Sequence, residues 1–319
     1  MGNLKRDLME LAGHIFYFLI FPGFLFASIG GGFLSWLDRK ITARLQFRVG
    51  PPLLQPFYDF VKLLGKEVIV PVNASRPLFF MAPVFAVAGA SLAIMFILLP
   101  AFGITPGFRG DLIVVFYLLM IPSVSYIIGA LSSGNPLANL GASREMKLVI
   151  GYELSLLLVI GAVILKAGNS ISLSEIMAVQ QEGGAFIGSI SGVLLFIPLM
   201  MCVQAKLALV PFDVADAETE VAGGIFIECS GLVLALIKLA KHIMLLALPS
   251  FVAVILLGGL RFEGLHILWS LLKLLGVVLV ISLIRNTNPR LTTGQALRFF
   301  FVWMNVIAVI AIGLAYIGL

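Results

Sequence analysis

The chain has 319 residues, of which 61% are hydrophobic and 12% are charged, with a net charge of +5. Soluble domains have roughly 45–50% apolar and about 25% charged residues, so this composition excludes a soluble protein of one or two domains. We expect an all-α integral membrane protein, in which the excess of Lys and Arg reflects topology and does not indicate a nucleic-acid partner.

The apolar segments are long enough to cross a bilayer, whose core of about 30 Å needs roughly 20 residues per helix. We predict eight spans, at about 11–36, 78–101, 111–131, 147–166, 186–206, 222–247, 264–285 and 298–318. Residues 249–260 extend the sixth segment beyond a break that we expect at Pro249. No small-residue cleavage site follows the first segment, so we expect a retained helix and not a signal peptide. The chain is thus predicted to be one polytopic membrane domain, residues 1–319.

The Lys and Arg residues are distributed unequally between the two sides of the predicted membrane. Thirteen lie in the connections between spans 1–2, 3–4, 5–6 and 7–8, five lie on the other side, and three lie inside spans. By the positive-inside rule, the four rich connections face the cytoplasm and both termini face outward. We therefore predict a multi-pass protein of the cytoplasmic membrane.

The connection 37–77 is the longest on the predicted cytoplasmic side. In it, Phe57, Phe60, Val61 and Leu64 recur at helical spacing, which predicts an amphipathic helix. Such a helix lies in the interfacial plane or forms a docking surface for a soluble partner, and the two interpretations are compatible.

Ionisable residues inside the predicted spans cost at least ~2.5 kcal/mol each to insert and are therefore functional candidates. They are Glu153 in the fourth span, Glu228, Lys238, Lys241 and His242 in the sixth, and Lys273 in the seventh. In a continuous helix, Glu228, Lys238 and His242 share one face. This stripe indicates a proton or ion relay, whereas the alternative is a set of buried salt bridges or lysines that reach the interface.

The connection 207–221 contains four acids within eight residues, Asp213, Asp216, Glu218 and Glu220. Acids near a helix N-terminus are favoured by the helix dipole, which accounts for Asp213 after Pro211 but not for all four. Crowded carboxylates raise one another's pKa, which suits proton uptake. The two cysteines, Cys202 and Cys229, are too few for an iron–sulfur cluster, which takes about four ligands. We expect no cofactor and no metal in this chain.

Four segments of the chain carry a further signal: LDRKITARLQFRVGPPLLQPFYDFVKLLGKE (37–67), GASREMKLVIGYE (141–153), PFDVADAETEVAGGIFIECSG (211–231) and RNTNPR (285–290). Together they resemble the NADH dehydrogenase subunit 1 family of respiratory complex I. The resemblance covers nearly the whole chain and implies a membrane subunit that joins the redox arm of a complex to its ion-pumping arm.

At two places the sequence departs from the pattern of complex I members and is similar to the membrane-bound [NiFe] hydrogenase branch of this family. That branch includes formate hydrogenlyase, energy-converting hydrogenases and related archaeal sulfane-reducing complexes. Complex I members usually carry a longer Gly-Pro-Asn-x-x-Gly-Pro insert at this point, whereas this chain has no such insert between Gly50 and Pro56. Ser143 to Met146 stands where they usually place small residues and Gln after the Arg. Both departures put a conventional quinone site in doubt.

The resemblance also implies roles for individual residues. The acids at 213, 216, 218 and 220 match a loop at the mouth of a chain of buried carboxylates, and Glu153 and Glu228 match acids within that chain. The residues that match or adjoin the segments contacting the soluble arm are Arg39, Lys40, Arg44, Arg48, Arg144 and Glu145.

The expected function is a non-catalytic subunit that anchors the soluble arm of a ferredoxin-oxidising hydrogenase or sulfane reductase and helps to move H⁺ or Na⁺. The implied partners are a hydrogenase-like large subunit, an iron–sulfur subunit and antiporter-like membrane subunits, with iron–sulfur clusters and a nickel–iron centre in the partners. The alternatives are a quinone-cavity subunit of NADH:quinone oxidoreductase and a stand-alone secondary transporter. The absence of an internal repeat in the sequence disfavours the transporter.

Overall fold

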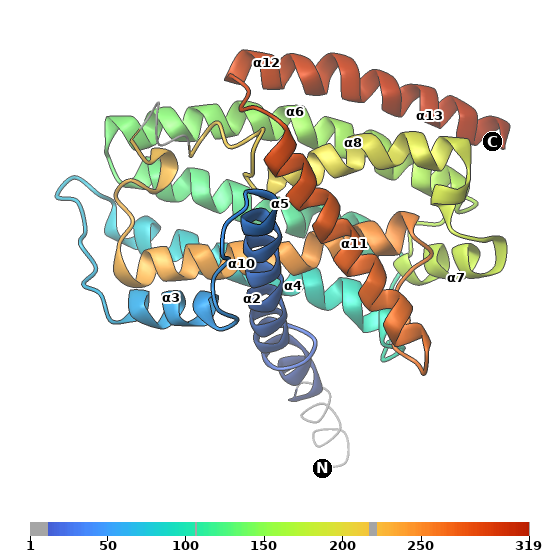
Figure 1. Cartoon of the computed structure of the whole chain (residues 1–319), viewed down its shortest axis with the longest axis horizontal. Coiled ribbons are helices and arrows are strands. Elements are labelled where there is room, and N and C mark those ends of the chain that lie inside the picture. Colours follow the sequence, from blue (N-terminus) through green and yellow to red (C-terminus); the bar gives the residue numbers. More distant parts are fainter. Residues whose placement is uncertain (1–11, 106, 217–221, 319) are drawn as a thin grey trace, which may run out of the picture.

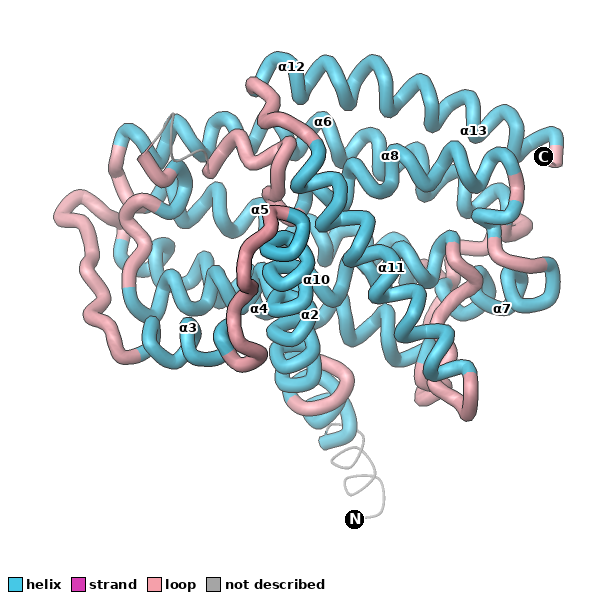
Figure 2. The backbone as a smooth tube through the Cα atoms, viewed as in Figure 1, coloured by secondary structure: helices cyan, strands magenta, loops and turns pink. Residues whose placement is uncertain are grey.

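The computed structural model describes residues 12–105, 107–216 and 222–318, and these ranges contain helices and loops but no strand (Figures 1 and 2). The long helices are α2 (Phe24–Leu45), α4 (Arg76–Ala101), α5 (Asp111–Ser132), α6 (Pro136–Lys166), α8 (Ile190–Lys206), α10 (Gly231–Leu256) and α11 (His266–Thr287). The last span joins α12 (Thr293–Arg298), the π-helical turn η3 (Phe299–Met304) and α13 (Asn305–Ile317). The short elements are α3 (Gln55–Leu64), α7 (Leu173–Gly183), η1 (Phe186–Gly188) and η2 (Gly224–Phe226).

Seven helices among the described residues are long and apolar enough to span a membrane, and α8 is a shorter apolar helix of 17 residues. The prediction of an all-α membrane protein is therefore confirmed. The predicted span 186–206 is shorter than expected because its first residues form η1. The Ser189 side chain then caps α8 by accepting a hydrogen bond from the Gly192 N–H.

Helix α10 lies at the centre of the molecule. In its most apolar 18-residue stretch 89% of residues are buried, against 28% in the first span and 22% in the last. α10 packs along α4 and is crossed by α2, while α13 packs on α6 and α8. In Figure 1, α2 and α11 run obliquely across the other long helices. The second half of α10 is therefore enclosed by protein, whereas Lys238 in its first half is exposed. The outer helices present apolar surface suited to lipid.

Two helix boundaries differ from the predicted ones. α6 begins at Pro136, because the Asn135 side chain caps its N-terminus by accepting from the Leu137 N–H, and a proline is favoured in the first turn. The segment containing Arg144 and Glu145, expected in a loop, is therefore helical. α10 begins only at Gly231 because residues 222–230 form turns and η2, so Glu228 precedes the helix.

The prediction of a helix break at Pro249 was wrong. α10 continues through this proline to Leu256, which is tolerated in membrane helices where neighbouring segments satisfy the freed backbone groups.

The predicted amphipathic helix is present as α3. Its Phe57 ring packs against Phe33 of α2 at 5.4 Å between ring centroids, whereas Val61 is 64% exposed. The preceding residues Arg39, Lys40 and Arg44, expected in a loop, form the end of α2. α3 packs against α2 and α10, the two helices that contribute charges to the site described next.

Candidate functional site

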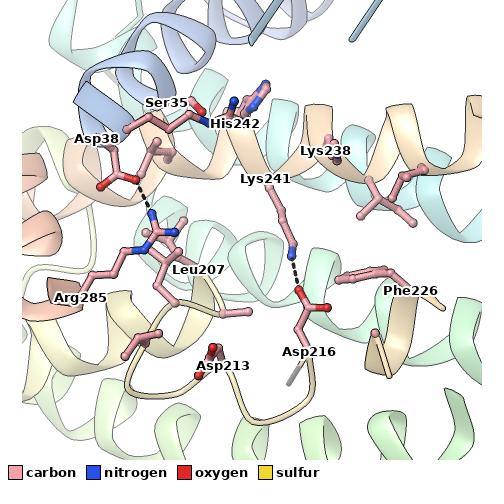
Figure 3. Close-up of a pocket in the computed structure, with 18 of the residues that line it drawn as sticks. Ser35, Asp38, Leu207, Asp213, Asp216, Phe226, Lys238, Lys241, His242 and Arg285 are labelled. Carbon is pink, nitrogen blue, oxygen red and sulfur yellow. Dashed lines mark hydrogen bonds and ion pairs between the residues drawn. The ribbon is translucent and has the colours of Figure 1, made fainter. Parts of the chain in front are cut away.

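A polar cavity of about 640 Å³ lies between α2, α10, the end of α11 and the loop 207–216 (Figure 3). We call it the charged cavity. Helix α2 contributes an acid and a base, α10 contributes three basic side chains, and the remaining charges come from the acidic loop, the end of α11 and the loop after it. The charged and titratable lining residues are Asp38, Arg39, Asp213, Asp216, Lys238, Lys241, His242, Arg285 and Arg290.

One wall of the charged cavity is an ion pair between α2 and α11. The Arg285 guanidinium lies 2.7 Å from Asp38 Oδ2, and the Ser282 hydroxyl donates to Asp38 Oδ1 at 2.7 Å. Asp38 is 5% exposed, so its charge depends on these two partners. The pair holds the two oblique helices together at the level of the cavity.

The acidic loop supplies the opposite wall. Asp213 lies 2.9 Å from the Arg290 guanidinium, and Asp216 lies 3.3 Å from Lys241 Nζ (Figure 3). Lys241 also sits 4.4 Å from the centroid of the Phe226 ring, a cation–π contact. Each acid of this loop that the structure describes therefore faces a cation from another segment.

The loop is held in place by packing and by one glycine. Phe212 is fully buried with its ring 4.8 Å from that of Phe300, and the Pro211 carbonyl accepts from the Leu291 N–H at 3.1 Å. A Cβ on Gly224 would lie 1.9 Å from the Ala215 carbonyl, at a φ of 55° that favours glycine. These contacts position Asp213 and Asp216 beside the cavity.

Burial raises the pKa of the Asp213 carboxyl, the Arg290 charge opposes this, and the Asp216 charge adds to it. The predicted crowding of carboxylates is therefore the smaller cause for this residue. Asp213 Oδ1 is buried without a hydrogen-bond partner among the described residues. Asp213 can thus take up a proton at a higher pH than an ordinary aspartate.

Two more acids lie deeper, on α6. Glu145 is 3% exposed and within electrostatic reach of Lys241, Asp216 and Lys206. Glu153 forms a buried salt bridge with Lys206. Eight residues of helix separate the two glutamates, which is a rise of roughly 12 Å. Carboxylates and cations therefore alternate from the charged cavity into the interior.

These inner acids are incompletely satisfied. Among the described residues, Glu145 Oε2 and Glu153 Oε2 are buried without a hydrogen-bond partner. A buried polar atom without a partner costs free energy unless water or a proton satisfies it. The arrangement is therefore chemically suited to holding protons and water molecules.

The basic residues of α10 fall into two groups. Lys241 is paired with Asp216, whereas within the described ranges no carboxylate forms an ion pair with Lys238 or His242. Lys238 lies within electrostatic reach of Asp59, which in turn pairs with Arg39 at 3.0 Å. Lys238 is therefore a cation of the cavity wall that can attract an anion or repel a proton.

The structure separates the predicted ion-path residues into distinct sets. Five of them, Asp213, Asp216, Lys238, Lys241 and His242, line the charged cavity, and Glu153 lies deeper beside Lys206. Glu228 accepts a hydrogen bond from the Asn135 side chain and does not line the cavity. Glu218 and Glu220 lie outside the described residues.

The predicted docking residues are also divided. Arg44 and Arg48 are exposed, whereas Lys40 and Arg144 are half-buried. Arg39 lines the cavity and pairs with Asp59, and Glu145 is buried. Arg39 and Glu145 therefore belong with the internal charges and not with an exposed docking surface.

Sequence reasoning missed four participants. They are Asp38, Arg285, Arg290 and Lys206, which look like ordinary loop charges in the sequence. Nothing in the local sequence reveals that Asp38 pairs with Arg285 or that Lys206 pairs with Glu153. The segments LDRK and RNTNPR that carry the family resemblance contain three of the four, and that was the available signal. No group of three or more His, Cys, Asp or Glu side chains within the described part of the chain could hold a metal ion.

Comparisons with known proteins agree with this architecture. The profile of a family described as NADH dehydrogenase matches residues 18–316. This chain belongs to the NADH dehydrogenase subunit 1 family. The corresponding NADH-quinone oxidoreductase subunit of Thermomicrobium roseum is 34% identical over 307 residues, which cover 88% of this chain and 89% of the relative. Its counterpart in Dehalococcoides mccartyi is 32% identical, over 89% of this chain and 80% of the relative.

A solved structure also matches the chain. It is that of a membrane-bound sulfane sulfur reductase, described as an archaeal respiratory membrane complex, with a TM-score of 0.83, 30% identity and coverage of 92% of this chain and 96% of the other. The resemblance seen in the sequence is thereby confirmed. The protein is a multi-pass membrane component of a complex I-like respiratory complex.

Proposed function

We propose that this subunit anchors the soluble arm of a ferredoxin-oxidising complex of the membrane-bound hydrogenase or sulfane reductase type. It couples electron transfer in that arm to the translocation of H⁺ or Na⁺. The observation that carries the proposal is the charged cavity, beside which the buried acids Glu145 and Glu153 follow one another along α6. The redox centres, including iron–sulfur clusters and a nickel–iron centre, would belong to partner subunits.

Coupling needs charges that respond to events in the soluble arm. Asp213 and Asp216 stand in a loop at the cavity, each paired with a cation from a different segment. A small displacement of this loop changes the distances of both pairs, and it thereby changes the proton affinity of the buried acids.

Docking of the soluble arm is supported by the surface next to the cavity. Arg44 and Arg48 are exposed, Phe47 between them is 100% exposed and Val49 is 92% exposed. Exposed apolar side chains flanked by arginines are typical of the centre of a protein–protein interface. We propose that this surface, residues 44–49, binds the hydrogenase-like large subunit and its iron–sulfur partner, and that antiporter-like membrane subunits pack elsewhere. The surface and the cavity would then face the cytoplasm, with both termini outside.

The second candidate is a quinone-cavity subunit of NADH:quinone oxidoreductase, favoured by the names of the relatives and by the cavity volume. Its charged lining and the absence from the sequence of the longer insert after Gly50 favour the first proposal. A stand-alone transporter is disfavoured because the relatives and the matched structure are components of complexes.

Purification of the native complex distinguishes these functions. Reduced ferredoxin and NADH are compared as electron donors, and protons, polysulfide and a water-soluble quinone as acceptors. We expect oxidation of ferredoxin with protons or polysulfide as acceptor, and uptake of ions into sealed vesicles. Oxidation of NADH with reduction of quinone alone would support the second candidate.

A further inference from the structure

A second polar cavity, of about 180 Å³, lies at the end of α11 away from the charged cavity. Nineteen residues of helix, a rise of roughly 28 Å, separate the first residue of α11 from Arg285. The cavity, which we call the arginine–lysine pocket, is lined by Arg261, His266 and Lys273 together with Gln181, Trp269 and Ser270. In Figure 1 this region lies where the loop after α10 approaches α7.

The pocket is held by buried hydrogen bonds. The Ser270 hydroxyl, 2% exposed, donates to the Arg261 carbonyl at 2.7 Å and accepts from the Arg261 N–H at 2.9 Å. Lys273 Nζ donates to the Gly259 carbonyl at 2.8 Å. The Gly258 N–H donates to the side chain of the buried Gln180 at 2.8 Å. The backbone of the loop and the Lys273 ammonium are therefore held in place at the pocket.

The charge of the arginine–lysine pocket is not balanced by the protein. Within the described ranges its lining contains no carboxylate, and no carboxylate forms an ion pair with Arg261, His266 or Lys273. Glu263 lines a neighbouring cavity, which Arg261 also borders, but forms no ion pair with Arg261. The charges of Arg261 and Lys273 are close enough to repel each other. An anion bound between them would relieve this repulsion and accept hydrogen bonds from both.

The surroundings indicate which anion this is. The pocket lies at the first turns of a membrane span, where Trp269 is 63% and Leu268 is 60% exposed. Exposed tryptophans typically lie at the level of the lipid head groups, and guanidinium groups bind phosphate through paired hydrogen bonds. We propose that the arginine–lysine pocket binds an anionic phosphate group, carried by a membrane phospholipid whose chains lie along the exposed leucines of α11.

The test uses the whole purified complex after removal of lipid by detergent exchange. Phosphatidylglycerol with brominated acyl chains is titrated in, and quenching of Trp269 is obtained by subtracting the signal of a Trp269→Phe complex. We expect saturable quenching, weakened about tenfold or more in Arg261→Gln, since a charged hydrogen bond is lost. The Arg261 side chain is exposed, so this variant should assemble normally. Arg109→Gln, an exposed arginine outside the pocket, should bind as the wild type does.

Two comparisons identify the source of the phosphate. Brominated diacylglycerol, which lacks phosphate, should not give saturable quenching, and excess inorganic phosphate should not displace the lipid. Displacement of the lipid by excess inorganic phosphate would mean that the pocket binds a free anion, and it would overturn the assignment to a phospholipid. Unchanged lipid affinity in both Arg261→Gln and Lys273→Met would contradict the proposal that the lipid binds in this pocket.

Discussion

At the scale of single residues, the charges around the cavity differ in how completely they are neutralised. Asp38 has two partners, whereas Asp213 and Glu153 each pair with one cation and keep one oxygen without a partner among the described residues. A buried carboxylate with both oxygens satisfied is held in place by its partners. Asp38 therefore has an architectural role, whereas Asp213, whose pKa is raised by burial, is suited to proton exchange.

The first prediction concerns protonation of Asp213. Burial raises the pKa of this carboxyl in the folded protein, so the folded state binds a proton over a pH range in which the unfolded chain has lost it. The stabilisation is present below the ordinary aspartate pKa of about 3.9 and is lost as the pH rises through the raised value. Infrared spectra of the ¹³C-aspartate-labelled complex should show a protonated carboxyl band above that pH, and the band should lose intensity in Asp213→Asn.

Asp59→Asn is the matched control for this experiment. Burial tends to raise the pKa of Asp59, but hydrogen bonds from Arg39 and Gln55 outweigh it and lower the pKa. The band should therefore persist in Asp59→Asn. A wild-type complex with no protonated aspartate band above the ordinary pKa contradicts the prediction.

The second prediction compares two lysines. Lys206 is buried in a salt bridge with Glu153, so Lys206→Met leaves a carboxylate uncompensated and should cost about 3–5 kcal/mol. Assembly should be poor, and Glu153→Gln in the same chain should restore it. Within the described ranges Lys238 pairs with no carboxylate, so Lys238→Met should assemble normally.

The same variants test the relay. Assembled Lys238→Met complex should continue electron transfer while ion uptake into sealed vesicles per electron pair is lost. The quantity to measure is this uptake ratio, normalised to assembled complex by immunoblot. An unchanged ratio would mean that Lys238 has no part in ion movement.

At the scale of elements, close approach between α2 and α10 fixes one side of the charged cavity. A Cβ on Gly31 of α2 would lie 2.0 Å from the His242 carbonyl oxygen of α10. No side chain fits at this crossing, so the two helix backbones are in contact beside His242, which lines the cavity. Small residues at such crossings are common in membrane helices.

The third prediction is that Gly31→Ala separates these helices. Overpacking at this contact should destabilise the subunit by about 1–3 kcal/mol and lower the thermal midpoint of the purified complex. Gly161→Ala on α6 is the control, because nothing lies within 4 Å of its Cβ and alanine favours a helix. Equal midpoints for the two variants would show that the crossing tolerates a side chain.

The elements show where sequence reasoning succeeds and where it fails. Hydropathy located every long helix because burial in lipid or protein requires a continuous apolar run. It missed the first turns of α6, because these turns contain the polar residues Asn139, Arg144 and Glu145 and therefore do not form a continuous apolar run. The Asn135–Pro136 pair is a helix-start signal that could have corrected this boundary. The start of α10 at Gly231 was obscured by apolar residues that fill turns.

The candidate site was predictable only in part for a related reason. Glu153, Lys238 and Lys241 could be identified as candidate site residues because they are ionisable residues within apolar spans. Their partners Lys206 and Asp216 were visible as charged residues, but the pairing depends on how distant helices pack. The helical wheel through Glu228 failed because the segment before Gly231 is not helical.

At the scale of the whole molecule, the last turns of α2 connect the charged cavity to the exposed surface of residues 44–49. Arg39 faces the cavity, and Arg44 lies one to two turns further along the same helix. A partner bound to this surface can therefore shift the end of α2 and with it the Asp38–Arg285 pair. Such a two-site arrangement is the physical requirement for coupling.

The fourth prediction concerns docking. Arg44→Glu together with Arg48→Glu should release the soluble arm while the membrane subunits stay assembled, because both side chains are exposed and contribute charge to the interface. Gel filtration of the solubilised complex measures the loss. Arg109→Glu, exposed at another connection, should retain the arm. A soluble arm that stays bound to the double variant at physiological ionic strength would exclude docking through these arginines.

The Asp38–Arg285 pair has a consequence for the biogenesis of the protein. Its two residues are 247 positions apart in the chain, so at about 5–20 residues per second the ribosome makes Arg285 roughly 12–50 s after Asp38. During that interval Asp38 has no Arg285 to pair with, and burial of its carboxylate without this partner would be costly. The crossing of α2 and α11 at the charged cavity should therefore close only after α11 has been inserted. A chain truncated before α11 should be recognised by membrane proteases as incomplete.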